Sequence, residues 1–361
     1  MNFNKIILDN GTSSIKAGKY DDKPSIIIPT LTANFEGSSF CGDEALVNKK
    51  YLTLNNPIER GVIKNWEEME KIWSYIFTEG LQIDTSDYSL VVSEPIYNPK
   101  ENTKRLIEYI FEAFNFSDLL IEISPYLTKA ATGKFSAYVI EIGEGLTQMA
   151  PFIDDKCIPF KAERMDLGGV DVTEYMKNLL NNSGILSSTN ADNYIFKDIK
   201  EKSCYVARHF KKEKNKFEPY TYELPDKSTI SIKSQRFECP EMLFRPNLFG
   251  LDEEQGIVKK SYNIIEKCKE HRKTLYNNIV FSGGSSKFSG LNERFTLEIK
   301  KLCTDLLDKD ININLPNERE NLTWIGGYII SGLASYDSIC TTRSEYEEKG
   351  SAILLEKMHK Y

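Results

Sequence analysis

The chain has 361 residues, of which 40% are hydrophobic and 27% are charged, a composition typical of soluble globular proteins. Its formal net charge of −7 argues against non-specific nucleic-acid binding, which depends on clustered lysine and arginine. No apolar run is long enough to span a bilayer, and the seven scattered cysteines lack CxxC spacing, which favours free thiols in a reducing compartment. We therefore expect a soluble intracellular protein that is large enough for two domains.

Short apolar strands alternate with helical patterns along the chain, which predicts an α/β fold. The first strand, residues 5–8, runs directly into the turn Asp9-Asn10-Gly11-Thr12-Ser13-Ser14. The spacing of apolar residues predicts a helix over 66–77 with Asn65 as its N-cap. A strand over 89–92 and a further amphipathic helix over 102–114 follow.

A second strand with a similar turn lies in the middle of the chain. Residues 137–140 run into Glu141-Ile142-Gly143-Glu144-Gly145-Leu146-Thr147, so both segments read as strand, acid, any residue, glycine and small or polar residues. One such segment alone is most simply an ordinary tight turn. Its repetition predicts an internal duplication in which two similar domains point their turns into a common cleft.

Further glycine pairs are expected at the boundaries of other elements. They are Gly168-Gly169 before a helix over 172–180, Gly283-Gly284 after a strand over 278–281, and Gly326-Gly327 at the start of an apolar helix that runs to Leu333. No linker-like stretch divides the chain, so we expect the two domains to be interleaved in sequence.

The two turns have the residues that a phosphate site requires. Backbone amides in tight glycine turns can surround phosphate oxygens, because glycine leaves no Cβ in the way. The first turn, 11–14, adds hydroxyl groups, with Lys16 as a phosphate cation, and 143–147 supplies the opposing turn. We expect Asp9 and Glu141 to hold the waters of a Mg²⁺ or Ca²⁺ ion. Neither GxxxxGK[ST] nor GxGxxG occurs, so P-loop and Rossmann sites lose support.

Short segments in a fixed order along nearly the whole chain are similar to one known family. They include Asp9-Asn10-Gly11-Thr12, Gly42-Asp43-Glu44-Ala45, Met69-Glu70-Lys71-Ile72-Trp73, Asp166-Leu167-Gly168-Gly169-Val170-Asp171, Ile199-Lys200-Glu201-Lys202, Ser282-Gly283-Gly284 and Trp324-Ile325-Gly326-Gly327. In this order the segments resemble those of actin and the actin-related proteins.

The resemblance implies the actin-like ATPase fold, an α/β molecule with two duplicated ribonuclease-H-like lobes, four subdomains and ATP in the central cleft. The implied divisions are subdomain 1 at 1–29, 57–131 and 322–361, subdomain 2 at 30–56, subdomain 3 at 132–167 and 254–321, and subdomain 4 at 168–253. By the same resemblance Asp9 and Glu141 hold the metal through water. The implied contacts with ATP or ADP are Gly11, Thr12, Ser13, Lys16, Gly143, Glu144, Gly145, Leu146, Gly169, Lys200, Glu201, Gly284, Ser285 and Phe288.

The departures from actin fall on the hydrolytic residues. Actin positions its attacking water with a glutamine and a histidine, and the matching positions here hold Ser124 and Gln148. Phosphoryl transfer depends on positioning and electrostatics, so the loss of both groups should slow hydrolysis by several orders of magnitude. We expect a nucleotide-stabilised structural subunit or filament component. The alternatives are a polymerising actin ATPase and a kinase or chaperone ATPase on the same fold.

Two surfaces bear on assembly. Residues 30–41 form a shorter segment than the actin loop that inserts into a neighbouring subunit, which disfavours homopolymerisation, although loop-length drift is an alternative. The positions that match actin's hydrophobic cleft are Ala130, Gly133, Ile325, Ile329, Ile330, Leu333 and Ile339. The expected partners at this cleft are other actin-fold subunits or actin-binding proteins, and an open cleft would take an amphipathic helix, whereas the same spacing also suits a core helix. We expect a cytoplasmic, cytoskeletal location, and a nuclear role stays open.

Overall fold

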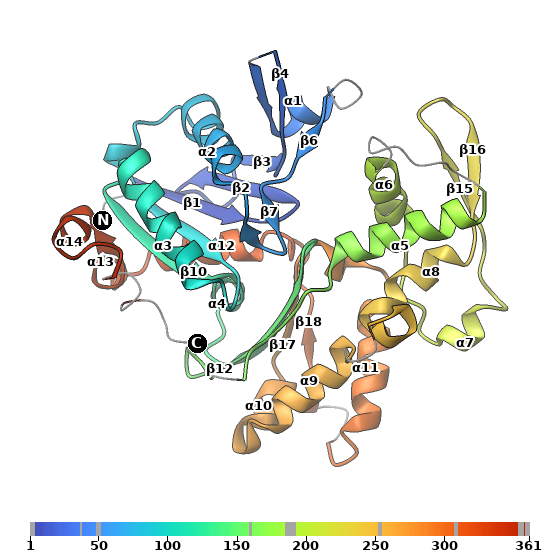
Figure 1. The fold of residues 1–361 in the computed structure, drawn as a ribbon. Helices are drawn as coiled ribbons and strands as arrows, with labels where there is room; N and C mark the ends of the chain where they lie inside the picture. The colour runs from blue at the N-terminus through green and yellow to red at the C-terminus, as the bar shows by residue number, and fades with distance from the viewer. Residues whose placement is uncertain are drawn as a thin grey trace.

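The computed structural model describes residues 4–36, 38–47, 52–158, 161–184, 193–251, 255–306, 310–352 and 357. Two six-stranded sheets divide the molecule into a first half and a second half (Figure 1). In the first sheet the strands are β1 (Lys5–Asn10), β2 (Ser14–Lys19), β3 (Ile26–Pro29), β9 (Ser89–Glu94), β10 (Asp118–Ile123) and β19 (Thr341–Thr342). In the second they are β11 (Ala137–Ile142), β12 (Thr147–Ile153), β13 (Lys156–Cys157), β14 (Glu163–Met165), β17 (Ile279–Ser282) and β18 (Ile313–Asn314).

The two sheets repeat one pairing arrangement. In the first, β1 forms an antiparallel hairpin with β2 and pairs in parallel with β9. In the second, β11 forms an antiparallel hairpin with β12 and pairs in parallel with β17. The repeat that the sequence predicted is therefore present in the strand pairing. The limits of the four subdomains stay a prediction.

Three smaller sheets complete the strands. They are β4 (Thr32–Phe35), β5 (Ser38–Cys41) and β6 (Leu54–Asn55); β7 (Ile58–Glu59) with β8 (Val62–Ile63); and β15 (Tyr220–Glu223) with β16 (Thr229–Ile232). The α-helices of the first half are α1 (Gly42–Val47), α2 (Trp66–Ser74), α3 (Lys100–Glu108), α4 (Ser124–Ala131), α12 (Leu322–Ser331), α13 (Tyr336–Ile339) and α14 (Arg343–Lys349). Those of the second half are α5 (Gly169–Asn182), α6 (Asn193–Ser203), α7 (Phe210–Glu213), α8 (Gln235–Glu238), α9 (Ile257–Glu266), α10 (Arg272–Tyr276) and α11 (Leu291–Leu302). Short 3₁₀ helices are η2 (Thr85–Asp87), η5 (Cys239–Leu243), η6 (Pro246–Phe249), η7 (Lys269–His271) and η8 (Gly284–Lys287).

Of the two predicted helices of the first half, α2 begins at Trp66 as expected and α3 begins two residues before the predicted start, and both end differently. Asn65 caps α2, since its side chain accepts a hydrogen bond from the Glu68 amide, as the sequence predicted. Each helix then continues as a π-helical turn, η1 (Tyr75–Gly80) after α2 and η3 (Tyr109–Ala113) after α3. The apolar faces stay continuous through these turns, and the Trp66 ring stacks on Tyr109 at 5.2 Å between ring centroids.

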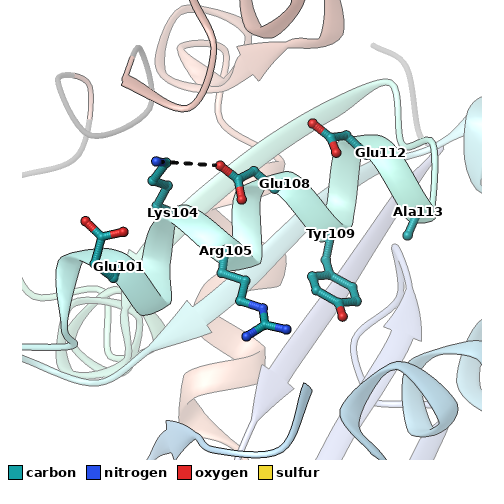
Figure 2. A pocket seen from close by; sticks show the side chains of 7 residues that line it. All are labelled: Glu101, Lys104, Arg105, Glu108, Tyr109, Glu112 and Ala113. Carbon is teal, nitrogen blue, oxygen red and sulfur yellow. Dashed lines mark ion pairs between the residues drawn. The ribbon is translucent and has the colours of Figure 1, made fainter. Parts of the chain in front are cut away.

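The outer side of α3 is polar. Figure 2 shows Lys104 and Glu108 on one side of the helix and Arg105 and Tyr109 on another, with 4.0 Å between Lys104 Nζ and Glu108 Oε1. The Arg105 guanidinium lies 5.0 Å from the centre of the Trp66 ring. This cation–π contact lies against the aromatic pair that Trp66 of α2 forms with Tyr109 of η3.

A shared core joins the two halves. One buried cluster contains side chains of both sheets and of α12, among them Ile7 and Val91 of the first sheet, Val139 and Val280 of the second, and Trp324 of α12. Separate clusters lie within each half. The chain leaves the first sheet after β10, builds the second half and returns through α12 and β19, so the halves are interleaved as predicted.

The predicted position of Gly326-Gly327 at the start of a helix is wrong, because both residues lie within α12. The reason is close packing between helices. A Cβ on Gly326 would lie 1.8 Å from the Leu127 carbonyl oxygen of α4, so only glycine allows α12 to approach α4 this closely. In the part of the chain that the structure describes, no helix is long and apolar enough to cross a membrane.

Candidate functional site

The turns of the two repeated hairpins lie against each other where the halves meet. A Cβ on Gly145, in the β11–β12 turn, would lie 2.5 Å from Thr12 Oγ1 in the β1–β2 turn. Glycine at 145 is therefore required by the close approach of the two turns. The structure brings together the two segments from which the sequence predicted a common site.

The first turn has an acid with a cationic partner. The pairing of β1 with β2 sets Asp9 opposite Lys16, and Lys16 Nζ lies 2.9 Å from Asp9 Oδ2. The Ser93 hydroxyl donates to Asp9 Oδ1 at 2.8 Å. Sequence reasoning missed Ser93, although its place at the carboxyl end of β9, parallel to β1, is where α/β sheets place functional groups.

The second turn has an acid with neutral partners. Glu141 Oε2 accepts from the Thr128 hydroxyl at 3.2 Å, and Oε1 accepts from the Gln148 amide at 3.2 Å. Burial and the negative charge of the nearby Asp9 raise the pKa of Glu141 to about 7. Asp9 and Glu141 thus lie close enough to repel, and a cation between them would relieve that repulsion.

The donor set at this junction fits a hard cation held through water. Two carboxylates, Asp9 and Glu141, are accompanied by hydroxyls, and oxygen donors are those that Mg²⁺ and Ca²⁺ prefer. The described residues hold no group of three or more His, Cys, Asp or Glu side chains that could ligate a metal. Two acids alone suit an ion that keeps most of its waters.

Ser124 and Gln148, the two positions that match the water-orienting residues, bond to each other. Gln148 Nε2 donates to Ser124 Oγ at 2.8 Å and to Glu141 Oε1 at 3.2 Å, while Gln148 Oε1 accepts from the Ile96 amide at 2.6 Å. The two residues are 6% and 3% exposed. Both amide N–H groups of Gln148 and its carbonyl are therefore engaged by the protein.

Helices α5 and α6 bring further predicted residues to the second turn. Lys200 Nζ lies 2.9 Å from Glu144 Oε2 and donates to the Gly169 carbonyl at 3.0 Å. The Ser285 hydroxyl donates to the Gly143 carbonyl at 3.0 Å. These contacts join five of the predicted residues into one contiguous cluster, namely Gly143, Glu144, Gly169, Lys200 and Ser285.

The sequence model of the actin family matches residues 2–359. The chain belongs to the actin family. This agrees with the segments that carried the resemblance and with the repeated sheets of the fold.

The remaining predicted nucleotide contacts of this actin-family protein differ in burial, and some of them are exposed to solvent. Leu146 is buried in the second turn, whereas Gly284 lies exposed at the start of η8. Glu201 is exposed on α6, and Phe288 packs its ring against the core of the second half. The assignment of Glu201 and Phe288 to a nucleoside stays a prediction.

Two cations at the junction were missed by sequence reasoning. Lys197, one turn before Lys200 on α6, donates from Nζ to Ser13 Oγ at 2.6 Å and so links the second half to the first turn. Arg60 forms two hydrogen bonds with Asp171 of α5, at 2.5 and 2.7 Å. The i, i+3 spacing to Lys200 could have indicated Lys197, but no local pattern marks Arg60.

The predicted partner cleft of this actin-family protein is only partly exposed. Ile329 on α12 is 36% exposed and Leu333, two residues beyond the end of the helix, is 45% exposed, whereas Ile330 is 5% exposed and belongs to the shared core. Gly133 is exposed, and Ala130, Ile325 and Ile339 are partly buried against the shared core. The core interpretation therefore holds for Ile330, and two apolar side chains, Ile329 and Leu333, stay exposed at the end of α12 and just after it.

Two surface hollows lie elsewhere on the first half. One, of about 430 Å³, lies over α3 and η3 (Figure 2), and the other, of about 530 Å³, lies between α2, η1 and the β5–α1 segment. Neither is lined by a residue of the two turns. The candidate site is thus defined by contacts between the turns and not by these hollows.

Proposed function

We propose that this actin-family protein binds ATP with Mg²⁺ or Ca²⁺ between its two turns and acts as a nucleotide-stabilised structural subunit that hydrolyses ATP slowly or not at all. The backbone amides of 11–14 and 143–146 would face the phosphates, with Lys16 as a cation beside them. Asp9 and Glu141 would hold the waters of the metal, which supplies charge neutralisation when bound. Ligand binding to the folded state alone stabilises it by mass action, which suits a structural role.

The observation that supports slow ATP hydrolysis is the hydrogen bond between Ser124 and Gln148. Hydrolysis of a phosphoanhydride requires a water held in line with the leaving oxygen. The amide of Gln148 is held by Ser124, Glu141 and the Ile96 backbone, and serine is too short to replace a glutamine. At these two positions, therefore, no side chain is left to orient that water.

The test is to purify the protein without added nucleotide, denature it and identify what is released. Mostly ATP supports tight binding without turnover, and mostly ADP contradicts slow hydrolysis. Phosphate release is then compared between wild type and the double variant Ser124→Gln/Gln148→His. We expect the double variant to be faster by roughly 10²-fold or more. Ser86→Gln, at an exposed serine of η2, is the control for adding a glutamine.

We also propose that the protein occupies a filament end or binds partners in preference to polymerising with itself. The segment that replaces actin's long loop is a tight hairpin, in which β4 and β5 pair from Thr32 opposite Cys41 to Phe35 opposite Ser38. Such a hairpin has no long loop to insert into a neighbouring subunit. The exposed side chains of Ile329 and Leu333 suit an amphipathic helix of an actin-binding partner. Sedimentation in polymerising salt tests this, and efficient pelleting would favour the polymerising ATPase instead.

A further inference from the structure

The segment that leads into α12 lies along η8. The Gly283 amide, just before η8, donates to the Arg319 carbonyl at 3.0 Å, and Arg319 Nε donates to Ser286 Oγ at 3.2 Å. One residue further along each segment, Lys287 Nζ donates to Glu320 Oε1 at 2.7 Å. Side chains of this segment therefore lie beside the short helix that holds predicted nucleoside contacts.

The same segment buries two acceptor oxygens, Glu320 Oε2 and Asn321 Oδ1. Neither has a hydrogen-bond partner among the described residues. Asn321 is the N-cap of α12, a position where an asparagine oxygen commonly accepts from the helix, yet its side chain forms no cap hydrogen bond with the described residues. A buried acceptor without a donor costs free energy. The two oxygens point to a ligand that brings its own donors.

The direction of η8 relates these oxygens to the candidate site. The helix starts at the second turn, because the Ser285 hydroxyl donates to the Gly143 carbonyl at 3.0 Å. A Cβ on Gly284 would have no described atom within 4 Å, so the space beside this residue is open. The other end of η8 holds Lys287, which pairs with Glu320. A nucleotide with its phosphates between the two turns would extend along η8 and bring its base to this pair.

The groups at this end of η8 complement one purine more fully than the other. Guanine presents two donors on its base-pairing edge, N1–H and the 2-amino group, beside the acceptor O6. Adenine presents a single donor group there, the 6-amino group, beside the acceptor N1. Two acceptor oxygens next to an ammonium group match the guanine pattern, whereas adenine leaves one of the oxygens without a donor.

We propose that Lys287, Glu320 and Asn321 read the base, so that the site takes guanine nucleotides as well as adenine nucleotides. The proposal rests on the proposed nucleotide site. Glu320 Oε2 and Asn321 Oδ1 accept from N1–H and the 2-amino group of guanine, and Lys287 donates to O6. Adenine binds through its 6-amino group. A site with buried acceptors favours the ligand that supplies a donor to each of them.

The experiment measures binding of GTP, ATP and inosine triphosphate, each with Mg²⁺, by calorimetry. Inosine triphosphate has the N1–H and O6 of guanine and lacks its 2-amino group. For the wild type we expect GTP to bind at least as tightly as ATP. Inosine triphosphate should bind roughly ten-fold more weakly than GTP, because one buried acceptor is left without a donor.

Three variants locate the effect. Glu320→Gln and Lys287→Met should each raise the ratio of the GTP dissociation constant to the ATP dissociation constant roughly ten-fold, because a charged partner of guanine is lost. Asn321→Leu should remove the difference between GTP and inosine triphosphate. The matched control is Glu318→Gln, at an exposed acid of the same segment, which should leave the ratio unchanged. Because the ratio is taken within one protein, a change in the folded fraction cancels.

The outcomes separate this proposal from the proposed function. If the wild type binds ATP and binds GTP more than roughly 100-fold more weakly, base reading is overturned and the nucleotide site stands. If Glu320→Gln weakens GTP and ATP equally, the carboxylate contacts a part that both share, such as the ribose, and base reading is also overturned.

Two further results would count against base reading. If Glu318→Gln changes the ratio as much as Glu320→Gln, the effect is one of surface charge and base reading is overturned. If the wild type binds none of the three nucleotides, the proposed function is overturned, and base reading with it.

Discussion

The two turns of the candidate site have the same sequence pattern and backbone arrangement but different electrostatics. In the first turn Asp9 has Lys16 Nζ at 2.9 Å. In the second turn Glu141 has a hydroxyl and an amide as donors, and its pKa rises to about 7 through burial and the charge of Asp9. The repeat has therefore preserved the geometry of the turn and not its charge compensation.

The difference comes from one register position in each hairpin. The residue opposite Asp9 on β2 is Lys16, and the residue opposite Glu141 on β12 is Gln148. A lysine at the first position neutralises its acid, whereas a glutamine at the second cannot. If a cation binds as proposed, the second turn would gain more from it than the first, and the predictions below test that asymmetry.

The largest effect is expected from Glu141→Gln. Under the proposed function the substitution would remove one of the two carboxylates that hold the hydrated metal, so affinity for Mg²⁺–ATP should fall by roughly 100-fold. Calorimetric titration measures it. Glu174→Gln, at an exposed acid of α5, is the matched control and should bind as wild type. Unchanged affinity in Glu141→Gln would show that the second acid does not hold the metal.

Lys16→Met makes the first turn resemble the second. Affinity for ATP should fall by roughly 30-fold, because a cation beside the phosphates is lost. The pKa of Glu141 should also rise further, since Lys16 lowers it in the wild type. Lys19→Met, an exposed position on the same strand, serves as control. Equal losses in the two variants would mean that Lys16 acts only through the general charge of the surface.

Gly145→Ala tests the contact between the turns. Its Cβ would lie 2.5 Å from Thr12 Oγ1, so the turns should move apart and ATP affinity should fall by roughly ten-fold. Adding Thr12→Ala removes the hydroxyl and should recover part of the loss. If Gly145→Ala binds normally, the turns do not need to touch for the site to work.

The smallest effect is expected in the pH dependence of stability without metal or nucleotide. Because the folded pKa of Glu141 is raised to about 7, its protonated form favours the folded state, and this contribution is lost as pH rises from about 4.5 to 7. We expect a loss of about 1 kcal/mol from this partly exposed group, measured by urea unfolding. Glu141→Gln should abolish the contribution of this residue to the pH dependence of the unfolding free energy. Glu94, whose pKa burial raises to about 7, would leave a similar dependence in both proteins.

The sequence predicted the features that depend on local pattern. The strand-turn repeat, the Asn65 cap and the glycine pair at the start of α5 follow from local residue chemistry, and each is present. The π-helical ends of α2 and α3 were not predicted, because an apolar stripe looks the same whether one turn has an extra residue or not. The resemblance to actin identified Ser124 and Gln148 as the positions that match its two water-orienting residues.

The resemblance could not show that the side chains of Ser124 and Gln148 form a hydrogen bond, since this bond joins the start of α4 to β12. Arg60 was missed for the same reason. Its partner Asp171 lies 111 residues away, and nothing in the residues around Arg60 indicates a contact at such separation. Contacts that define the site are tertiary, and local pattern does not determine them.

The return of α12 to the first sheet has a consequence for synthesis of the chain. The Trp324 indole donates to the Ile7 carbonyl at 3.1 Å across 317 residues of sequence, and a Cβ on Gly327 would lie 2.7 Å from Ile7. At ~5–20 residues per second, a ribosome needs ~15–60 s after it has made β1 to make α12, the helix that packs against this strand. Until α12 is made, its contacts with Ile7 are missing, and incompletely packed apolar strands favour aggregation of newly made chains.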